Sequence, residues 1–144
     1  MNPIIWGKYG WFFLHSITLG YPSCPTKTEK TQFKNFFTNI GNVLPCDRCK
    51  INYKSHLKKF PLNDDILSSK IKLIHWLIDI HNSVNKINGK KVLTYEEAIG
   101  IYSEKYDETL IKKYNILIKI STSIFILLII IFISYHIYNS NYRF

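Results

Sequence analysis

Apolar residues recur three or four positions apart along most of the first hundred residues, and no stretch alternates apolar and polar residues as a strand would. Residues 6–19 carry an aromatic or aliphatic side chain on nearly every turn, which predicts a largely buried helix that ends at Gly20. A second helix is predicted to start near Thr26 or Thr28 and to continue to about residue 44.

Three more helical segments follow. The third helix is predicted to begin at the cysteine pair and to stop before Pro61. The fourth spans about residues 66–87, with Asp64 or Asp65 available to cap its start. Thr94 and the glutamate three positions later form a capping-box pattern, which predicts a short fifth helix through residue 106.

The composition changes sharply after residue 119. Residues 120–137 contain no acid, lysine or arginine, and at 1.5 Å per residue they span roughly 27 Å, close to the hydrocarbon core of a bilayer. A buried core helix is the alternative, but the preceding residues cannot readily wrap a segment that is apolar all round while covering their own core. The predicted fold class is therefore all-α: a four-helix bundle plus a short fifth helix, followed by a single C-terminal transmembrane helix.

Basic residues are concentrated on the N-terminal side of this segment. They are Lys105, Lys112, Lys113 and Lys119, whereas Arg143 alone follows. The positive-inside bias predicts a tail-anchored protein whose globular part faces the cytoplasm, and a domain facing the secretory lumen is the alternative topology. The predicted organisation is a globular domain at residues 1–108, a basic juxtamembrane linker at 109–119, a transmembrane helix at 120–138 and a short tail at 139–144.

The bulk composition excludes several classes of protein. The chain of 144 residues is 47% hydrophobic, enough for one domain with a packed core. Three cysteines are too few for a disulfide-stapled secreted scaffold, and the N-terminus lacks the pattern of a signal peptide. The net charge of +9 comes from scattered lysines, which favours a solvated basic surface over a nucleic-acid interface and leaves attraction to anionic membranes open.

The most reactive motif is the pair Cys46 and Cys49, preceded by Pro45. Two thiols three positions apart at a helix start can close a small reversible disulfide, and the helix N-terminus together with Arg48 and Lys50 stabilises a thiolate there. Pro45 suits such a start because the first helical turn does not use its missing N–H. A thioredoxin-like site would need a βαβ unit, so a redox pair in an all-helical domain needs a cofactor as its electron acceptor.

Half of a zinc site is the alternative interpretation of the pair. His75 and His81 could complete it, but 25 residues separate Cys49 from His75, more than a compact zinc finger uses. Six residues also turn a helix through about 600°, which leaves the two imidazoles on nearly opposite faces. We therefore predict no metal, treat His56 and His75 as ordinary histidines, and keep a non-enzymatic, membrane-anchored zinc adaptor as the alternative function.

Two further groups of residues could hold a cofactor. Trp11 and His15 lie on successive turns of the first helix. His81, Val84 and Asn85 share one face of the fourth, where a carboxamide aimed inward needs a polar partner. For either histidine alone, an ordinary hydrogen-bonded side chain is the alternative.

Five stretches, in order and with matching gaps, resemble the FAD-linked Erv/ALR sulfhydryl oxidases over about residues 7–106. They are Gly7-Lys8-x-x-Trp11-x-x-x-His15, Tyr21-Pro22-x-x-Pro25-Thr26, Pro45-Cys46-x-x-Cys49, Trp76-Leu77, and His81-Asn82-x-Val84-Asn85 followed by Gly89-Lys90. The resemblance implies a helical bundle that holds FAD beside the cysteines, with Cys49 contacting the flavin and Cys46 exchanging with incoming dithiols. The residues that it places along the cofactor are Gly7, Lys8, Trp11, His15, His81, Asn82, Val84, Asn85, Lys90 and Tyr102.

The chain also departs from the family pattern. Lys8 stands where the family has arginine, which keeps a positive charge for a phosphate but loses the bidentate fork. Ile78 and Tyr95 replace the two halves of a structural disulfide and could pack on each other. Tyr102 and Tyr106 replace two tryptophans, so flavin stacking by Tyr102 is expected on weaker grounds.

The predicted function is FAD-dependent thiol oxidation, in which electrons pass from Cys46 and Cys49 to FAD and then to O₂, giving H₂O₂. The thiols would come from a protein dithiol substrate or a separate redox shuttle protein, and the resemblance implies a homodimer formed through the first helices. Cys24 is expected to be an inert thiol, with a mixed or intersubunit disulfide as the alternative. An anchored oxidase facing a reducing compartment resembles the forms encoded by large cytoplasmic DNA viruses, which make disulfides in virion proteins, so its membrane would belong to the host or the virion. A membrane-tethered nucleic-acid-binding protein ranks last among the hypotheses.

Overall fold

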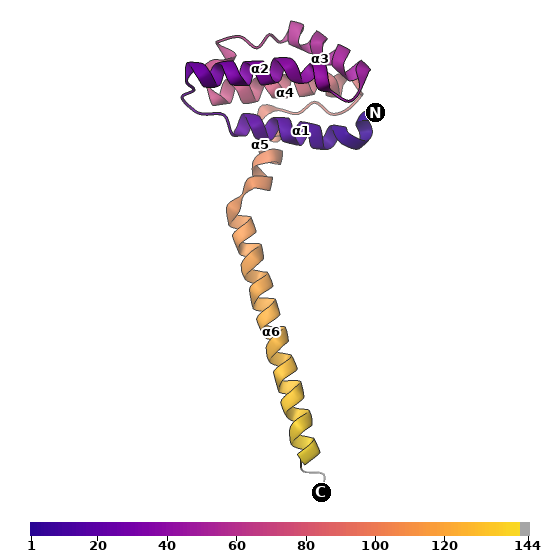
Figure 1. Cartoon of the computed structure of the whole chain (residues 1–144), viewed down its shortest axis with the longest axis vertical. Helices are drawn as coiled ribbons and strands as arrows, with labels where there is room; N and C mark the ends of the chain where they lie inside the picture. The colour runs from indigo at the N-terminus through magenta and orange to yellow at the C-terminus, as the bar shows by residue number, and fades with distance from the viewer. Residues whose placement is uncertain (142–144) are drawn as a thin grey trace. The chain divides into compact units, whose positions relative to one another are not determined.

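The computed structural model describes the backbone of residues 1–141 and the side chains of residues 1–107 and 112–139. Every regular element in this part is helical, which confirms the all-α prediction (Figure 1). The elements are α1 (Pro3–Leu19), α2 (Lys27–Val43), α3 (Asp47–Lys59), the 3₁₀ turn η1 (Ile66–Ser68), α4 (Lys70–Ile87), α5 (Tyr95–Ser103), the 3₁₀ turn η2 (Glu104–Tyr106) and α6 (Glu108–Asn141). The chain divides into two compact units, Met1–Ser103 and Glu104–Phe144. Arg143 of the predicted tail lies outside the described residues.

Side-chain caps set where the first helices begin. The Asn2 side chain accepts a hydrogen bond from the Ile4 N–H at 3.0 Å, ahead of a proline in the first turn of α1. Thr26 and Glu29 form a reciprocal capping box at α2. These local signals explain why the second helix begins close to the predicted position.

The start of α4 differs from the prediction. Residues 66–68 form the separate turn η1, and Ser69 is extended and caps α4 by accepting from the Lys72 N–H at 3.4 Å. The expectation that Asp64 or Asp65 caps this helix is therefore wrong. The Asp65 carboxylate instead accepts a hydrogen bond from the Lys72 ammonium group at 2.6 Å.

The core of the first unit is built around α4, which packs against α1, α3, α5 and η1. Its buried members come from all the bundle helices and from the connections between them: Leu14, Tyr21, Phe37, Tyr53, Leu62, Leu67, Leu73, Trp76, Leu77 and Ile80. The polar atoms of Tyr21, Tyr53 and Trp76 are satisfied inside the core. Tyr21 donates to the Leu67 carbonyl at 2.9 Å, and the Trp76 indole donates to the Phe60 carbonyl at 3.0 Å.

The prediction that α1 is largely buried is wrong. Leu14, His15 and Thr18 are its only buried residues, because α1 packs against α4 and α5 alone among the described elements. Ile5, Tyr9 and Phe13 are 73%, 71% and 57% exposed, and their four-residue spacing places them on one face. An apolar face of α1 is thus left uncovered by the described residues of the first unit.

Gly41 allows α2 and α3 to approach closely. A Cβ atom at position 41 would lie 2.5 Å from Cδ1 of Tyr53. The Tyr53 ring is buried, and its hydroxyl donates to the Phe37 carbonyl at 2.8 Å, so the ring has little freedom to move aside. The close packing fixes the helix that carries the cysteine pair.

We expect Gly41→Ala to lower the free energy of unfolding by about 1–2 kcal/mol, because overpacking against Tyr53 outweighs the helix propensity that alanine adds. Gly100→Ala is the matched control: an added Cβ meets nothing within 4 Å, so this substitution should stabilise α5 by about 0.5–1 kcal/mol. Urea unfolding of both variants checks the pair. Effects of the same sign would contradict the packing described for Gly41.

The end of α4 and the start of α5 follow the sequence signals. Gly89 has a φ of +65°, the left-handed conformation expected of it. Thr94 and Glu97 exchange the two hydrogen bonds of a capping box, at 2.9 and 3.1 Å. The helix is shorter than predicted, since α5 ends at Ser103 and a 3₁₀ turn follows.

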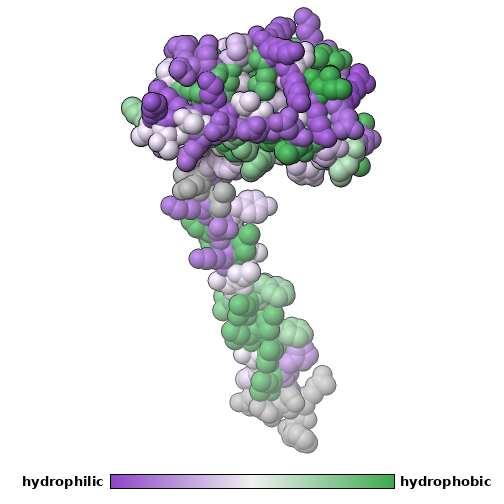
Figure 2. Space-filling view, turned by 45° about the horizontal axis from the view of Figure 1, so that its top comes forward, coloured by the Kyte–Doolittle hydropathy of each residue, from purple (hydrophilic) through white to green (hydrophobic). Residues whose placement is uncertain are grey.

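The second unit is dominated by α6, a single helix of 34 residues. The predicted linker and transmembrane segments are therefore parts of one continuous helix. Within it, residues Lys112–Asn139 are long and apolar enough to cross a membrane, and none of their side chains is buried. Figure 2 shows the apolar side chains gathered along α6.

Candidate active site

The first part of the candidate site is a disulfide at the start of α3. Cys46 is the N-cap residue and is disulfide-bonded to Cys49, and the two Cα atoms lie 5.1 Å apart. The Cys49 N–H donates to Cys46 Sγ at 3.3 Å. Both cysteines are half-buried, so they are accessible from solvent. Pro45 precedes the cap, which corrects the expectation that it lies in the first turn.

The charges around the disulfide are partly paired. The Lys50 ammonium group donates to the Asp47 carboxylate at 2.9 Å, and this contact holds the pKa of Asp47 below its ordinary value. Arg48 is exposed. The helix N-terminus stabilises negative charge on Cys46, whereas Lys50 contributes less than expected because Asp47 neutralises it. The contribution of Arg48 stays a prediction.

The second part is a cluster of four rings from α1, α4 and α5. Trp11 stacks on His81, with ring centroids 3.9 Å apart and 7° between the planes. His15 stacks on Tyr102 at 4.2 Å, and its Nε2 lies 3.1 Å from Nδ1 of His81. The structure thus brings together four of the predicted cofactor residues from three different helices.

Both histidines of the cluster are uncharged at neutral pH. Burial, reinforced by the neighbouring His81, lowers the pKa of His15 to about 3. Burial and the nearby Lys90 ammonium group lower the pKa of His81 to about 4. One neutral ring donates to the other in the 3.1 Å contact, and the cluster offers flat faces without buried charge.

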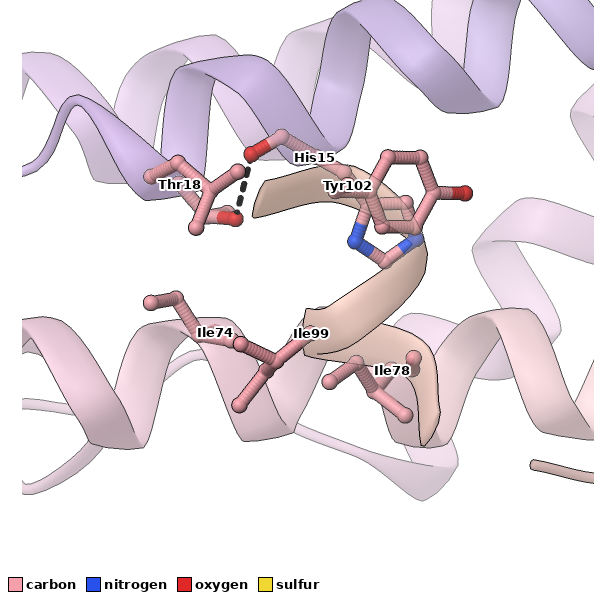
Figure 3. Close-up of a pocket in the computed structure, with 8 residues that line it drawn as sticks. His15, Thr18, Ile74, Ile78, Ile99 and Tyr102 are labelled. Atoms are coloured by element: carbon pink, nitrogen blue, oxygen red, sulfur yellow. Dashed lines mark hydrogen bonds between the residues drawn. The ribbon is translucent and has the colours of Figure 1, made fainter. Parts of the chain in front are cut away.

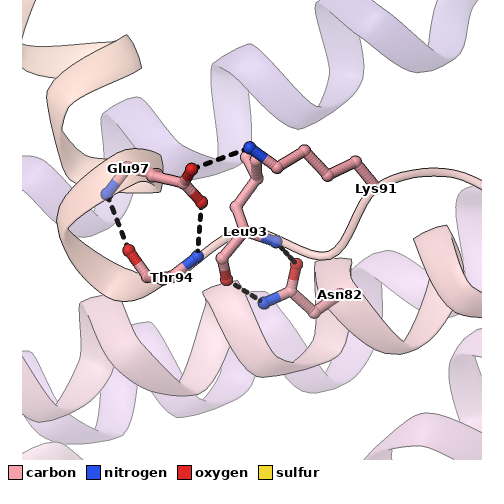
Figure 4. Close-up of polar contacts among 5 residues, drawn as sticks. All are labelled: Asn82, Lys91, Leu93, Thr94 and Glu97. Atoms are coloured by element: carbon pink, nitrogen blue, oxygen red, sulfur yellow. Dashed lines mark hydrogen bonds and ion pairs between the residues drawn. The ribbon is translucent and has the colours of Figure 1, made fainter.

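Asn82 makes a backbone contact that the sequence did not predict. Its carboxamide donates to the Leu93 carbonyl at 2.8 Å and accepts from the Leu93 N–H at 3.0 Å (Figure 4). Lys91 pairs with Glu97 at 2.7 Å in the same region. Asn82 therefore fixes the segment between α4 and α5, and its contact with a cofactor stays a prediction.

The remaining predicted cofactor residues lie on α1 and at the end of α4. Gly7 is half-buried and Lys8 exposed, both on α1, and Lys90 is exposed just after α4. Val84 and Asn85 are half-buried on the last turns of α4, and the Asn85 carbonyl accepts from the Lys90 N–H at 2.8 Å. Their direct contact with a cofactor also stays a prediction.

The hollows in the described structure include a small one and a larger one. A small one of about 10 Å³ lies beside the ring cluster (Figure 3) and is lined by His15, Thr18, Leu19, Ile74, Ile78, Ala98, Ile99 and Tyr102. A larger one, about 380 Å³, is lined by Lys27, Lys30, Thr31, Lys34, Asp64 and Leu67. The small hollow is about the size of one water molecule, and neither hollow includes the cysteine pair.

Sequence reasoning missed two buried nitrogen atoms that lack a hydrogen-bond partner among the described residues. They are Nε1 of Trp6 and Nε2 of His56. His56 is only 5% exposed and lies seven residues after Cys49, two turns along the same face of α3. That spacing from Cys49 was the sequence signal that could have singled out His56. The expectation of an ordinary, hydrogen-bonded histidine at position 56 does not hold for its Nε2 atom.

The zinc alternative finds no support in the described contacts. His75 stacks on Tyr95 with centroids 3.8 Å apart, whereas His81 stacks on Trp11. In the part of the chain that the structure describes, no group of three histidine, cysteine or acidic residues is placed to hold a metal ion. Cys24 is an exposed free thiol.

Comparison with known proteins identifies the family. The model of the Erv1 / Alr family matches residues 8–107. The Probable FAD-linked sulfhydryl oxidase R368 of Acanthamoeba polyphaga mimivirus is 50% identical over 113 residues, covering 78% of this chain and 76% of that protein. A FAD-linked sulfhydryl oxidase of African swine fever virus is 30% identical over 105 residues, covering 73% of this chain and 86% of that protein.

The crystal structure of the FAD binding domain of Erv1 from Saccharomyces cerevisiae is 26% identical, with a TM-score of 0.62 over 67% of this chain and 89% of that one. The chain spans less than half the length of its curated relatives from Arabidopsis and yeast. This chain therefore belongs to the Erv1/Alr family.

Proposed function

We propose that this protein is an FAD-dependent thiol oxidase that forms disulfides in protein substrates and reduces O₂ to H₂O₂. The observation that carries the proposal is the disulfide between Cys46 and Cys49 at the N-terminus of α3, in a chain of the Erv1/Alr family. A half-buried disulfide at a helix start is accessible to an incoming thiolate, and the helix end stabilises the thiolate that is released.

The residues present fit FAD. The ring cluster of Trp11, His15, His81 and Tyr102 supplies planar faces, and Lys8 and Lys90 supply positive charge for phosphates. The unpartnered nitrogen atoms of Trp6 and His56 are buried polar atoms that a bound polar ring would satisfy. When bound, FAD supplies two-electron transfer from a dithiol to O₂.

The chain's own cysteines perform the exchange chemistry. A substrate thiolate attacks Cys46 Sγ, the Cys46–Cys49 bond breaks, and Cys49 leaves as a thiolate. A second substrate thiolate then attacks the substrate sulfur of the mixed disulfide, which releases the oxidised substrate and leaves Cys46 reduced. Two electrons have moved from the substrate to the cysteine pair, and the N–H of Cys49 stabilises the charge on Cys46.

Oxygen uptake tests this function directly. The purified full-length protein should consume O₂ when dithiothreitol is added and should form one H₂O₂ for each O₂ consumed. It should also carry a flavin absorption band near about 450 nm. Protein that binds zinc, is colourless and consumes no O₂ would instead support the non-enzymatic adaptor.

The exposed face of α1 supports a homodimer. Ile5, Tyr9 and Phe13 form an apolar strip on a helix that is otherwise docked on the bundle, and a second copy of α1 would cover it. We expect Ile5→Glu/Tyr9→Glu to give a monomer in sedimentation velocity, because the substitution would place charge in the interface. Gln32→Glu, at an exposed position of α2, is the control that should leave the mass unchanged. A wild-type protein that already sediments as a monomer would contradict this arrangement.

The helix α6 supports attachment to a membrane, with the thiol oxidase domain in the cytoplasm. Lys112, Lys113 and Lys119 lie at the end nearer the domain in sequence, which fits the positive-inside rule. Together with the viral relatives, this topology fits disulfide formation in virion proteins, with a protein dithiol or a separate shuttle protein as the thiol donor. Protease protection of the tagged protein in microsomes separates this topology from a lumenal one.

A further inference from the structure

α5 is tied to α4 at its first residue by contacts that the proposed exchange chemistry does not use. The Tyr95 ring stacks on the His75 imidazole, with centroids 3.8 Å apart and 6° between the planes. The Tyr95 hydroxyl donates to Asp79, whose carboxylate oxygens lie 3.0 and 3.2 Å away. His75 and Asp79 are four residues apart on one face of α4, so a single tyrosine contacts two successive turns.

The hydrogen bond from Tyr95 to the Asp79 carboxylate is stronger than most hydrogen bonds made by a residue at the surface. A hydrogen bond to an ionised acceptor is worth more than one between neutral groups. Burial, followed by the contact with Asp79, raises the pKa of Tyr95, so the hydroxyl keeps its proton and remains a donor at neutral pH. The sequence left open that Tyr95 packs on Ile78. The structure instead places Ile78 in an apolar cluster with Ile74 and Ala98, and Tyr95 on His75 and Asp79.

α5 depends on such contacts because it is only nine residues long. A helix of this length is not stable by itself in water, so its position is set by what it packs against. Within the described domain its contacts with α1 and α4 fall in three groups. They are Tyr95 at the start, Ala98 and Ile99 beside Ile74 and Ile78 in the middle, and Tyr102 beside His15 and Phe12 at the end. The position of Tyr102 in the ring cluster therefore depends on the other two groups.

We propose that Tyr95 is a positioning residue, a latch without sulfur that fixes α5 on α4 and thereby holds Tyr102 against His15. The inference rests on the proposed function in one respect, because Tyr102 and His15 matter for catalysis only if they hold the flavin. Since the latch contains no cysteine, a reductant that opens the Cys46–Cys49 disulfide leaves it in place. The cofactor side of the domain then keeps its structure while the redox pair cycles, as a reducing compartment requires.

Hydrogen exchange of the full-length protein tests the latch. Tyr95→Phe keeps the stacking on His75 but removes the hydrogen bond, so amides in α5 should exchange several-fold faster. Tyr95→Ala removes both contacts and should speed exchange about tenfold or more, with a several-fold rise in the dissociation constant of FAD. Glu96→Gln, at the neighbouring exposed position, is the control that should change neither quantity. In the wild type, tris(2-carboxyethyl)phosphine should leave exchange in α5 unchanged.

The outcomes separate the latch from the proposed function. The latch would be overturned if the α5 amides of Tyr95→Phe, or of a folded Tyr95→Ala, exchanged at the wild-type rate. A reductant that exposes α5 in the wild type would overturn it too. If Tyr95→Ala does not fold, Tyr95→Phe decides alone. A wild-type protein without flavin and without O₂ uptake would defeat the proposed function, while its exchange in α5 would still decide whether Tyr95 fixes the helix.

Discussion

Replacing Cys49 by serine is expected to reduce dithiothreitol-dependent O₂ consumption at least about a thousandfold, the scale on which enzymes lose activity when a reacting nucleophile is removed. Cys49 is the leaving group when a thiolate attacks Cys46, and serine cannot form or accept a disulfide. The fold should be retained, because Cys49 is half-buried and lies outside the apolar core clusters. An oxygen electrode measures the rates of both proteins under identical conditions.

Cys24→Ser is the matched control for this experiment. Cys24 is exposed and free, and it lies in the connection between α1 and α2. Removing it should leave the rate with dithiothreitol within about twofold of wild type. Equal rates for Cys49→Ser and wild type would remove the cysteine pair from the mechanism.

The second large effect concerns pH. The free energy of unfolding should fall by about 1.4 kcal/mol per pH unit from His15 alone as the pH drops from about 6.5 towards about 4. The sign follows from proton binding: the folded pKa of His15, about 3, lies below the unfolded value of 6.5, so in this window the unfolded state binds the proton and the folded state does not. His81, whose pKa is lowered to about 4, adds a smaller amount because its side chain is partly exposed.

Urea unfolding at pH 7, 6 and 5 measures this slope. The variant His15→Leu/His81→Leu keeps apolar side chains in the cluster and removes both titrating groups, so most of the slope should disappear. A shallower slope should remain, because burial also lowers the pKa of His56, with a further contribution from Lys59. Identical slopes in the wild type and the double variant would show that the two histidines are not held neutral in the folded protein.

Local signals explain which parts of the fold could be predicted. The Thr26–Glu29 and Thr94–Glu97 capping boxes act within four residues, and Gly89 adopts its left-handed conformation for a reason that lies in its own backbone. The placement of Trp11 and His15 on the same face of α1 likewise follows from their four-residue spacing along one helix. The start of α4 was missed because Ser69 interrupts an apolar pattern that continues on both sides of it.

Contacts between helices could not be derived from the sequence. Nothing near Gly41 in the chain indicates that Tyr53 lies against it, and nothing near Tyr95 indicates that its partners are His75 and Asp79. Both contacts depend on how two helices dock, which the apolar pattern constrains only to a face. The exposed face of α1 was missed for the same reason, since an apolar side chain looks alike whether the bundle or another molecule covers it.

The site shows the same division. The redox pair was predictable from its motif. The stacking of Trp11 on His81 and of His15 on Tyr102 was not, nor was the contact of Asn82 with Leu93, because a motif identifies a residue but not its partner. The buried, unpartnered nitrogen of His56 could be seen only once the packing of α3 was known.

The most direct test of the central claim is an anaerobic titration of the purified protein with dithiothreitol, followed by absorbance near about 450 nm. In wild type, the flavin band should bleach, and admitting O₂ should restore it with formation of H₂O₂. In Cys46→Ser/Cys49→Ser the same reductant should leave the band essentially unchanged on that time scale. Equal bleaching of both proteins, or a wild-type protein with no flavin band, would contradict the proposal that these two cysteines pass electrons to FAD.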